Sequence, residues 1–315
     1  MALAPVSAPN DSSLDRLAAE AQALAARLPA LRLEARRIAH TVAFGVHGRR
    51  RAGPGETFWQ FRRFEQSDVR SQIDWRRSAS SDRLFVRERE WEAAHTVWLW
   101  ADLTPSMAFT SHLASTSKRD RALLLLFAIA ELLIEGGERV GLIGMMPPTA
   151  QRHASERIAE RVLQELRAPS AISGPKALTE ATLSRFSECV LIGDFLDPLE
   201  GTEAALRHLA GQGVRGQMVQ VLDPAEETLD YSGRVEFLDP EGGHRWLAPR
   251  AETMRDAYKA RLAAHRAGLD SMARRVRWSL LVHHTDRPAG EALLALYGRL
   301  SQEDRLTAQR REAAP

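Results

Sequence analysis

The chain has 315 residues, which is enough for one large α/β domain with an extension or for two modest domains. A hydrophobic content of 44% and a charged content of 27% are typical of an ordinary soluble protein. Lysine and arginine number 43 against 41 aspartates and glutamates, so the overall charge gives no indication of nucleic-acid binding.

Two segments are expected before the main domain. Residues 1–44 begin with a tail rich in Ala, Pro and Ser and then carry apolar residues at helical spacing, which predicts an amphipathic helix that packs on the main domain. Residues 45–94 begin with a Gly- and Arg-rich loop and contain interleaved arginines and aspartates, which predicts ion pairs. Trp75 and Phe85 are expected to anchor this segment as a packed brace. Its surplus arginines leave a binding role as the alternative.

Residues 95–302 are expected to form the main domain, because strands and helices alternate there. Apolar runs predict strands at 96–101, 139–145, 189–192, 214–222 and 277–283. Helices are expected at 119–135, 156–167, 180–186, 199–210, 251–274 and 290–301. Short βα units with nearly continuous apolar strands indicate an α/β fold with a doubly wound, mainly parallel sheet flanked by helices.

Some smaller features complete this interpretation. Residues 232–238 and 245–248 predict a hairpin, and residues 303–315 are expected to be a charged, frayed tail. Trp98 and Trp100 are assigned to the core. His283 and His284 follow each other on a strand and point to opposite faces, so one exposed and one half-buried histidine are expected. Cys189 is the single cysteine and also belongs to the core, which excludes a disulfide within the chain.

The sequence carries no sign of a membrane or export segment. Residues 1–10 have neither a basic start nor an apolar stretch, and no run of about 18 apolar residues occurs. We therefore expect a cytoplasmic protein with no transmembrane segment.

Oxygen-bearing side chains follow two of the predicted strands. Asp102, Thr104 and Ser106 are spaced two residues apart after the strand at 96–101, and Asp194 follows the strand at 189–192. Because ligands gather at the carboxyl ends of parallel strands, these residues meet at one edge if the two strands are neighbours. Carboxylate and hydroxyl oxygens suit Mg²⁺ or another divalent cation, and such a small set leaves a coordination position open. Capping of the next helix is the alternative role.

Two other aspartates also follow strand-like runs. Asp197 and Asp223 each precede a proline and are interpreted as turn formers.

The first set resembles the metal-dependent adhesion site (MIDAS) of von Willebrand factor A-like domains. That pattern is Asp-x-Ser-x-Ser after the first strand, a distant Thr, and an Asp after a later strand. Here the motif reads Asp102-x-Thr104-x-Ser106, and Asp194 matches the later acid. The resemblance implies that Thr179, with Ser173 as the other option, supplies the distant hydroxyl.

The segment before the domain resembles the signature of the bacterial family called domain of unknown function 58. Arginines, aspartates and a tryptophan carry this resemblance in the order Arg62, Asp68, Arg70, Ile73, Asp74, Trp75, Ser78 and Ala79, while Phe64, Ser67 and Ser80 replace the Tyr, Gly and Arg of the pattern. The resemblance covers roughly residues 45–301 and implies a von Willebrand A-like domain. The signature positions Arg62, Asp68, Arg70, Asp74, Trp75 and Arg76 are then partner-binding or structural.

Two functions follow from these resemblances. The first is a non-catalytic interaction module whose divalent cation binds a carboxylate of a protein partner; the family resemblance implies a MoxR-type AAA+ ATPase that acts in assembly or maturation of other proteins. The alternative is a metal-dependent phosphohydrolase that uses Asp102 and Asp194, since Asp102-x-Thr104 resembles the start of haloacid-dehalogenase-type phosphatases. Such an enzyme also needs a lysine, and Lys118 and Lys176 are the only ones between Thr96 and Asp223. Neither a P-loop nor a Gly-x-Ser-x-Gly motif occurs.

Overall fold

The computed structural model describes residues 29–43, 58–63, 73, 75–79, 84–89, 95–151, 153–167, 174, 176–241 and 243–312, of which residues 58–63, 77, 86–89 and 301–312 are described for the backbone alone. The chain divides into two compact units. The larger unit consists of Met1–Gly45 together with His95–Pro315, and the smaller unit is Val46–Ala94.

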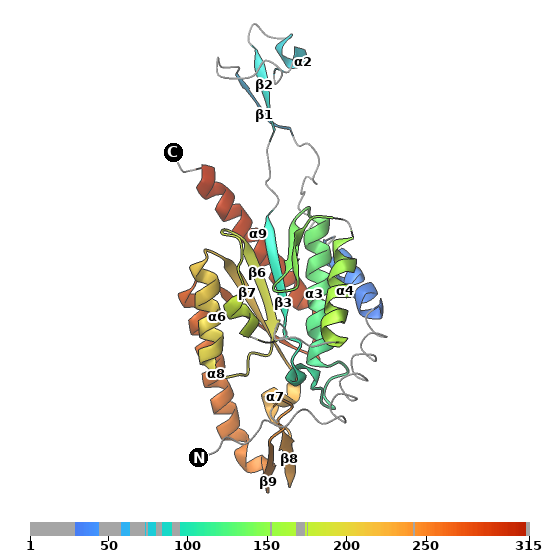
Figure 1. Ribbon diagram of the computed structural model, residues 1–315, viewed down its shortest axis with the longest axis vertical. Helices are drawn as coiled ribbons and strands as arrows, with labels where there is room; N and C mark the ends of the chain where they lie inside the picture. Colours follow the sequence, from blue (N-terminus) through green and yellow to red (C-terminus); the bar gives the residue numbers. More distant parts are fainter. Residues whose placement is uncertain are drawn as a thin grey trace, which may run out of the picture. The chain divides into compact units, whose positions relative to one another are not determined.

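A six-stranded sheet forms the centre of the larger unit (Figure 1). Its strands lie in the order β10 (Ser279–His284), β7 (Arg215–Leu222), β6 (Glu188–Gly193), β3 (Thr96–Ala101), β4 (Arg139–Leu142) and β5 (Met146–Thr149). All neighbouring pairs are parallel except β4 with β5, which is antiparallel. The predicted mixed α/β fold with a mostly parallel sheet flanked by helices is confirmed.

The edge strand β5 is a feature that the sequence interpretation missed. The predicted strand at 139–145 ends at Leu142, and Gly144 adopts a positive φ of 73° that allows the chain to turn back. Pro147 and Pro148 lie within β5. Prolines cannot donate to a sheet ladder, so they fit an edge strand and conceal it in the sequence pattern.

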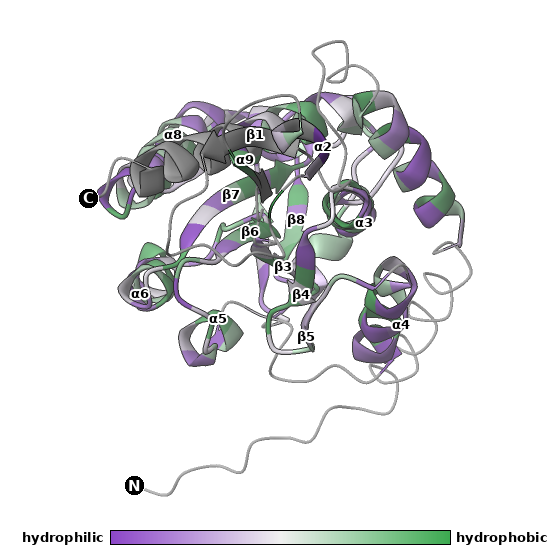
Figure 2. Cartoon of the chain, turned by 90° about the horizontal axis from the view of Figure 1, so that it is seen from above, coloured by the Kyte–Doolittle hydropathy of each residue, from purple (hydrophilic) through white to green (hydrophobic). Residues whose placement is uncertain are grey.

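Helices cover both faces of the sheet (Figures 1 and 2). Helix α3 (Lys118–Glu135) packs beside α4 (Ala154–Arg167) and α9 (Ala289–Glu312), and α6 (Leu199–Gly211) packs beside α5 (Lys176–Glu180) and α8 (Arg255–Arg275). Alternate residues of β3 point toward the helices on the two faces of the sheet. Trp100 belongs to a core cluster that includes residues of α5, α6 and α8, with Trp98 packed against it. Trp98 and Trp100 therefore belong to the core as predicted, and buried Cys189 lies in the same cluster.

Most predicted helices are present, with three differences at their ends. Helix α5 ends at Glu180, where the predicted helix was to begin, and the chain from Ala181 to Ser184 is irregular. The predicted helix at 251–274 begins as a short 3₁₀ turn, η3 (Ala251–Met254), before α8. The frayed tail expected after residue 303 is wrong as far as residue 312, because α9 continues to Glu312. No glycine or proline interrupts the chain between Gly298 and Glu312, so nothing in the sequence stops this helix.

The amphipathic helix expected near the N-terminus is described only in part. Residues 29–43 are helical, whereas residues 1–28 lie outside the described residues. Ala35, Ala39 and Val42 are buried, and Arg36 donates a hydrogen bond of 2.9 Å from Nε to Glu131 Oε1 on α3. Residues 29–43 therefore pack on α3.

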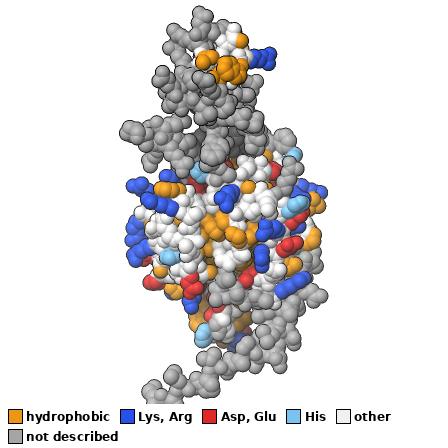
Figure 3. Space-filling view, turned by 45° about the horizontal axis from the view of Figure 1, so that its top comes forward, with side chains coloured by type: hydrophobic (Ala, Val, Ile, Leu, Met, Phe, Trp, Pro, Cys, Tyr) orange, Lys and Arg blue, Asp and Glu red, His pale blue; other side chains and the backbone are white. Residues whose placement is uncertain are grey.

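The smaller unit contains strands β1 (Phe58–Arg63) and β2 (Phe85–Arg89), which pair antiparallel, and a single helical turn, α2 (Trp75–Ser78). Ser78 Oγ accepts a hydrogen bond of 2.9 Å from the backbone N–H of Phe85, which ties α2 to β2. Trp75 is 64% exposed, so the anchor predicted at this residue does not pack within its own unit. Figure 3 shows hydrophobic side chains exposed on this unit.

The hairpin predicted after the fourth parallel strand is confirmed. Strands β8 (Val235–Leu238) and β9 (Arg245–Ala248) pair antiparallel, and the rings of Phe237 and Trp246 stack with centroids 5.8 Å apart. Within the described part of the chain, no helix is both long and apolar enough to cross a membrane.

Candidate metal centre

Asp102 and Asp194 lie at the same edge of the sheet because β3 and β6 are parallel neighbours. Ala101 pairs with Ile192 in the register of these strands, and the N–H of Asp102 donates a hydrogen bond of 2.8 Å to the carbonyl of Ile192. Gly193 makes this close approach possible. A Cβ at that position would lie 3.1 Å from Cβ of Asp102 and 3.5 Å from its Oδ2. The predicted meeting of the two strand ends therefore occurs.

The oxygen atoms of the motif after β3 form a chain of contacts that starts at the carboxylate of Asp102. Oδ1 of Asp102 accepts hydrogen bonds from the N–H of Thr104 at 2.9 Å and from its hydroxyl at 2.7 Å. Thr104 Oγ1 lies 3.1 Å from Ser106 Oγ. Ser106 belongs to a short 3₁₀ turn, η2 (Pro105–Ala108), which Thr104 precedes without a side-chain cap bond. Helix α3 is capped instead by Ser117, which accepts from the N–H of Asp120. Helix capping therefore does not explain these three residues.

The carboxyl group of Asp102 is buried without a basic partner among the described residues. Burial raises the pKa of Asp102 to about 7, the hydrogen bonds from Thr104 oppose this shift, and repulsion from Asp194 and Glu241 adds to it. Glu241 lies in the turn between β8 and β9, so that turn is close enough to act on the site.

Asp194 has a basic partner that the sequence interpretation did not assign to it. Oδ2 of Asp194 accepts a hydrogen bond of 2.7 Å from Lys118 Nζ, and the same ammonium lies 2.6 Å from Glu226 Oε1. Lys118 is 1% exposed. Burial opposes its charged form, but Asp194 and Glu226 outweigh this effect and raise the pKa of Lys118 above its usual value. Lys176, the other lysine considered, is exposed on α5.

Glu226 reaches Lys118 from helix α7 (Pro224–Thr228), which begins where a turn was predicted. Asp223 is the N-cap of this helix and forms a capping box with Glu226. It is fully buried, and it also accepts hydrogen bonds from the N–H and hydroxyl of Ser111. The prediction of a turn at Asp223 is wrong because proline is well suited to the first position of a helix.

The turn at Asp194 is held in a strained backbone conformation. Phe195 is buried and has a φ of 49°, which is unusual for a bulky residue. The carbonyl of Phe195 accepts a hydrogen bond of 2.7 Å from His265 Nε2, and that of Asp194 accepts one of 2.9 Å from Gln220 Nε2. The ring of Phe195 packs against Trp100, with centroids 6.3 Å apart. These contacts fix where Asp194 presents its carboxylate.

The distant hydroxyl is not among the groups brought together. The hydroxyl of Thr179 donates a hydrogen bond of 2.7 Å to the carbonyl of Lys176 within α5, and no described contact links Thr179 to Asp102. Ser173 lies outside the described residues. A Cβ at Gly174 would lie 3.5 Å from the methyl group of Thr104, so the loop before α5 approaches the motif at residue 174.

The signature residues of the smaller unit are described only in part. Trp75 and Arg76 are exposed, and the backbone of Arg62 lies in β1. The ion pairs predicted for Asp68, Arg70 and Asp74 lie outside the described residues.

The two histidines at the end of β10 are more buried than predicted. His283 is 5% exposed, and burial, followed by repulsion from Arg121 and His284, lowers its pKa to about 4. His284 is half-buried and lies 3.3 Å from Glu227. Their opposite orientations are those expected along a strand, but neither histidine is exposed.

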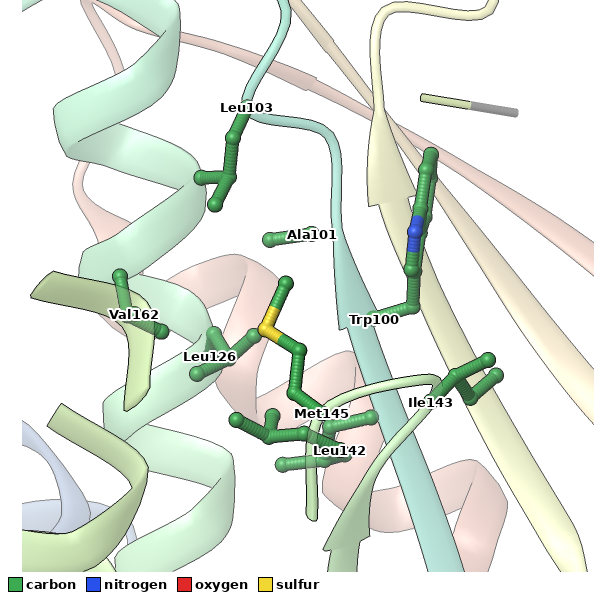
Figure 4. A pocket seen from close by; sticks show the side chains of 9 residues that line it. Trp100, Ala101, Leu103, Leu126, Leu142, Ile143, Met145 and Val162 are labelled. Carbon is green, nitrogen blue, oxygen red and sulfur yellow. The ribbon is translucent and has the colours of Figure 1, made fainter. Parts of the chain in front are cut away.

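A small pocket beneath the motif is apolar. Side chains of Ala101, Leu103 and Met145 gather between β3 and α3, as Figure 4 shows. The rest of its lining is Leu99, Trp100, Leu126, Leu142, Ile143 and Val162. It therefore offers a polar substrate no charged group.

The fold and this edge define a mixed α/β protein with acidic and hydroxyl side chains at the carboxyl ends of parallel strands. The chain belongs to the family described as protein of unknown function DUF58, whose sequence profile matches residues 60–268.

Sequence relatives occur in mycobacteria. The chain is similar to uncharacterized proteins of Mycobacterium tuberculosis and Mycobacterium bovis, with 27% identity over 277 residues, which is 84% of this chain and 86% of theirs.

Two solved structures also show a likeness. One is the conserved hypothetical protein BatB from Bacteroides thetaiotaomicron, with 17% identity, a TM-score of 0.42 and coverage of 66% of this chain and 100% of that chain. The other is an aerotolerance-related membrane protein from Bacteroides fragilis, with 16% identity and the same TM-score and coverage.

Proposed function

We propose that this protein is a non-catalytic interaction module with a von Willebrand A-like domain. In this proposal, Asp102, Thr104, Ser106 and Asp194 hold Mg²⁺ or another divalent cation. The cation keeps one coordination position open and binds a carboxylate of a protein partner there.

One observation carries the proposal: Asp102 is a buried carboxyl that accepts a hydrogen bond from the hydroxyl of Thr104, next to that of Ser106, and has no basic partner among the described residues. Its Oδ2 accepts no hydrogen bond within that part of the chain. A buried charge is costly unless it is paired or binds a metal, and a cation at this point would supply the missing charge. Carboxylate and hydroxyl oxygens are also the ligand types that hard divalent cations prefer, so the residues present fit the group.

A protein rather than a small molecule is favoured as the partner by the surface beside the motif. The β8–β9 hairpin exposes Leu238, Trp246 and Leu247 to solvent, and its turn lies close enough for Glu241 to act on Asp102. Exposed aromatic and aliphatic side chains next to a site are typical of protein interfaces. The family resemblance implies that the partner is a MoxR-type AAA+ ATPase and that the complex acts in assembly or maturation of other proteins.

Calorimetric titration of Mg²⁺ and Mn²⁺ into the metal-free chain tests this function. We expect metal binding by the wild type and loss of binding in Asp102→Asn. Asp197→Asn is the matched control and should retain binding. Asp197 is an exposed acid near the same edge, and its pKa is raised by burial and by Asp194. Equal binding by wild type and Asp102→Asn, or no binding by the wild type, refutes the metal site.

A metal-dependent phosphohydrolase is the second candidate, and the ion pair between Lys118 and Asp194 favours it. The pair supplies the lysine that such an enzyme needs next to its carboxylates. Turnover of a simple phosphomonoester in the presence of Mg²⁺, with loss of turnover in Asp102→Asn, would establish the enzyme. Metal binding by the wild type without turnover favours the interaction module.

A further inference from the structure

The edge of the sheet that carries the candidate metal centre holds one buried ammonium among several carboxylates. The ammonium belongs to Lys118 and pairs with Asp194 and Glu226, and Asp102 lies at the same edge. Asp223, which caps α7, is also buried there. Asp102 and Asp194 are 3% and 5% exposed, and the side chain of Glu226 is 16% exposed. Water therefore screens these charges poorly, and each of them affects the others.

Lys118 contacts the carboxylates of this edge directly. Its ammonium lies 2.7 Å from Asp194 and 2.6 Å from Glu226, and the ring centroid of Phe109 is 5.8 Å away. The residue is the first of α3, directly after the N-cap Ser117, so the helix fixes its backbone. The lysine thus bridges two acids that come from β6 and α7, and it leaves Asp102 without a basic partner.

The ammonium of Lys118 lowers the negative charge that a cation meets at this edge. It is paired with Asp194, one of the proposed ligands, so its positive charge opposes that of a cation bound there. We propose that Lys118 is an internal counter-cation that limits how tightly the site binds a divalent ion. This inference rests on the proposed function, because it concerns the same metal centre.

Removal of the lysine should have two consequences. The site would lose one positive charge, so a divalent cation would bind more tightly and a trivalent cation would gain more than a divalent one. A site loaded with a divalent cation would then be more negative by one charge, which repels the carboxylate of a partner. Lys118 therefore reduces metal affinity and favours the binding of an acidic ligand to the loaded site.

Four forms of the full chain separate charge from other effects of substitution. Relative to the wild type, Glu226→Gln removes one negative charge, the double variant Lys118→Gln/Glu226→Gln leaves the charge unchanged, and Lys118→Gln adds one negative charge. Glu226 is not among the proposed ligands, so it acts on the cation through its charge. Lys176→Gln removes an exposed lysine and serves as the matched control.

Mn²⁺ titrated calorimetrically at about pH 8, where the carboxylates are ionised, measures the series, with Tb³⁺ as the trivalent probe. We expect Mn²⁺ affinity to rise about tenfold with each added negative charge and to be equal, within about threefold, in the wild type and the double variant. The preference for Tb³⁺ over Mn²⁺ should be largest in Lys118→Gln. Lys176→Gln should bind as the wild type does.

The possible failures are distinguishable. Mn²⁺ binding by the wild type with no rise in Lys118→Gln overturns the role of Lys118 and leaves the metal site intact. Absence of binding in all four forms refutes the proposed function and this inference with it. If Lys118→Gln does not fold, the other forms still decide: unequal affinities of the wild type and the double variant, or undiminished affinity in Glu226→Gln, overturn the inference.

Discussion

Replacement of Asp102 by Asn is expected to stabilise the metal-free protein above neutral pH. Asn keeps the shape of the side chain and an oxygen that can accept the hydrogen bonds of Thr104, but it removes a buried charge that has no basic partner among the described residues. Burial raises the pKa of this carboxyl from its usual 3.8 to about 7. The folded state therefore holds the proton more tightly than the unfolded state does.

The sign and size of the effect follow from this difference. Between about pH 4 and pH 7 the unfolded chain has lost the proton of Asp102 while the folded chain retains it, so stability falls as the pH rises through this window and is constant above it. Each pKa unit is worth about 1.4 kcal/mol, which gives a loss of up to about 4 kcal/mol at neutral pH and above. Asp102→Asn lacks this loss. Bound Mg²⁺ should also abolish it in the wild type, because the cation stabilises the ionised carboxylate.

Urea denaturation in the presence of a chelator, at a series of pH values from about 4 to 8, measures the effect. The difference in unfolding free energy between Asp102→Asn and the wild type isolates Asp102, because the other titrating groups are shared. This difference should grow in favour of the variant from acid to neutral pH. A difference that does not change with pH would show that Asp102 is not a buried, unpaired charge.

Two further predictions concern the surroundings of the site. Burial lowers the pKa of His283 from the usual 6.5 to about 4. The contribution of His283 to the unfolding free energy is therefore highest above about pH 6.5 and falls by about 3 kcal/mol as the pH decreases toward 4. His283→Gln should flatten this part of the stability curve measured with urea, and an unchanged curve would contradict the shift. Gly193→Ala should cost about 1–3 kcal/mol and weaken Mn²⁺ binding, because its Cβ would lie 3.1 Å from Cβ of Asp102. Gly201→Ala is the control, because Gly201 lies in α6 and nothing lies within 4 Å of the added Cβ. This variant should stabilise the protein by up to about 1 kcal/mol and leave Mn²⁺ binding unchanged. Equal behaviour of the two variants would rule out the close approach at Gly193.

The parallel sheet could be predicted because its central strands are buried on both faces and therefore read as continuous apolar runs. The same reasoning brought Asp102 and Asp194 to one edge, since each follows such a strand and β3 and β6 are neighbours. Strand β5 was not predicted because its two prolines are unusual in a strand. An edge strand tolerates prolines, because it needs fewer backbone hydrogen bonds than a central strand. The sequence pattern therefore predicted the buried central strands, and it failed at the edge strand, where residues that are poor strand formers are tolerated.

The ion pairs of Lys118 could not be predicted in the same way. Lys118, Asp194 and Glu226 are far apart in the sequence, and they meet only because the start of α3, the end of β6 and helix α7 converge at one edge. A weak signal was present, since Lys118 is one of only two lysines between Thr96 and Asp223. Lys176, the other lysine, precedes Asp194 more closely in the sequence, but distance along the chain does not determine distance in the fold. The role of Asp223 could not be predicted from the sequence either, because the pair Asp-Pro occurs both in turns and at the start of helices.

Two costly features converge at this one edge. Phe195 holds a positive φ at a bulky residue, a conformation that costs on the order of 1–3 kcal/mol, and Asp102 buries a charge without a basic partner among the described residues. The ring of Phe195 packs in the core against Trp100, whereas the ionised form of Asp102 adds nothing to the packing of the sheet. Both features act on the position or charge of the carboxylates, because the strained turn sets the direction of Asp194 while Gln220 and His265 hold its backbone. The proposed cation site would give the burial of the Asp102 carboxyl a function, because a bound cation would pair with its ionised form.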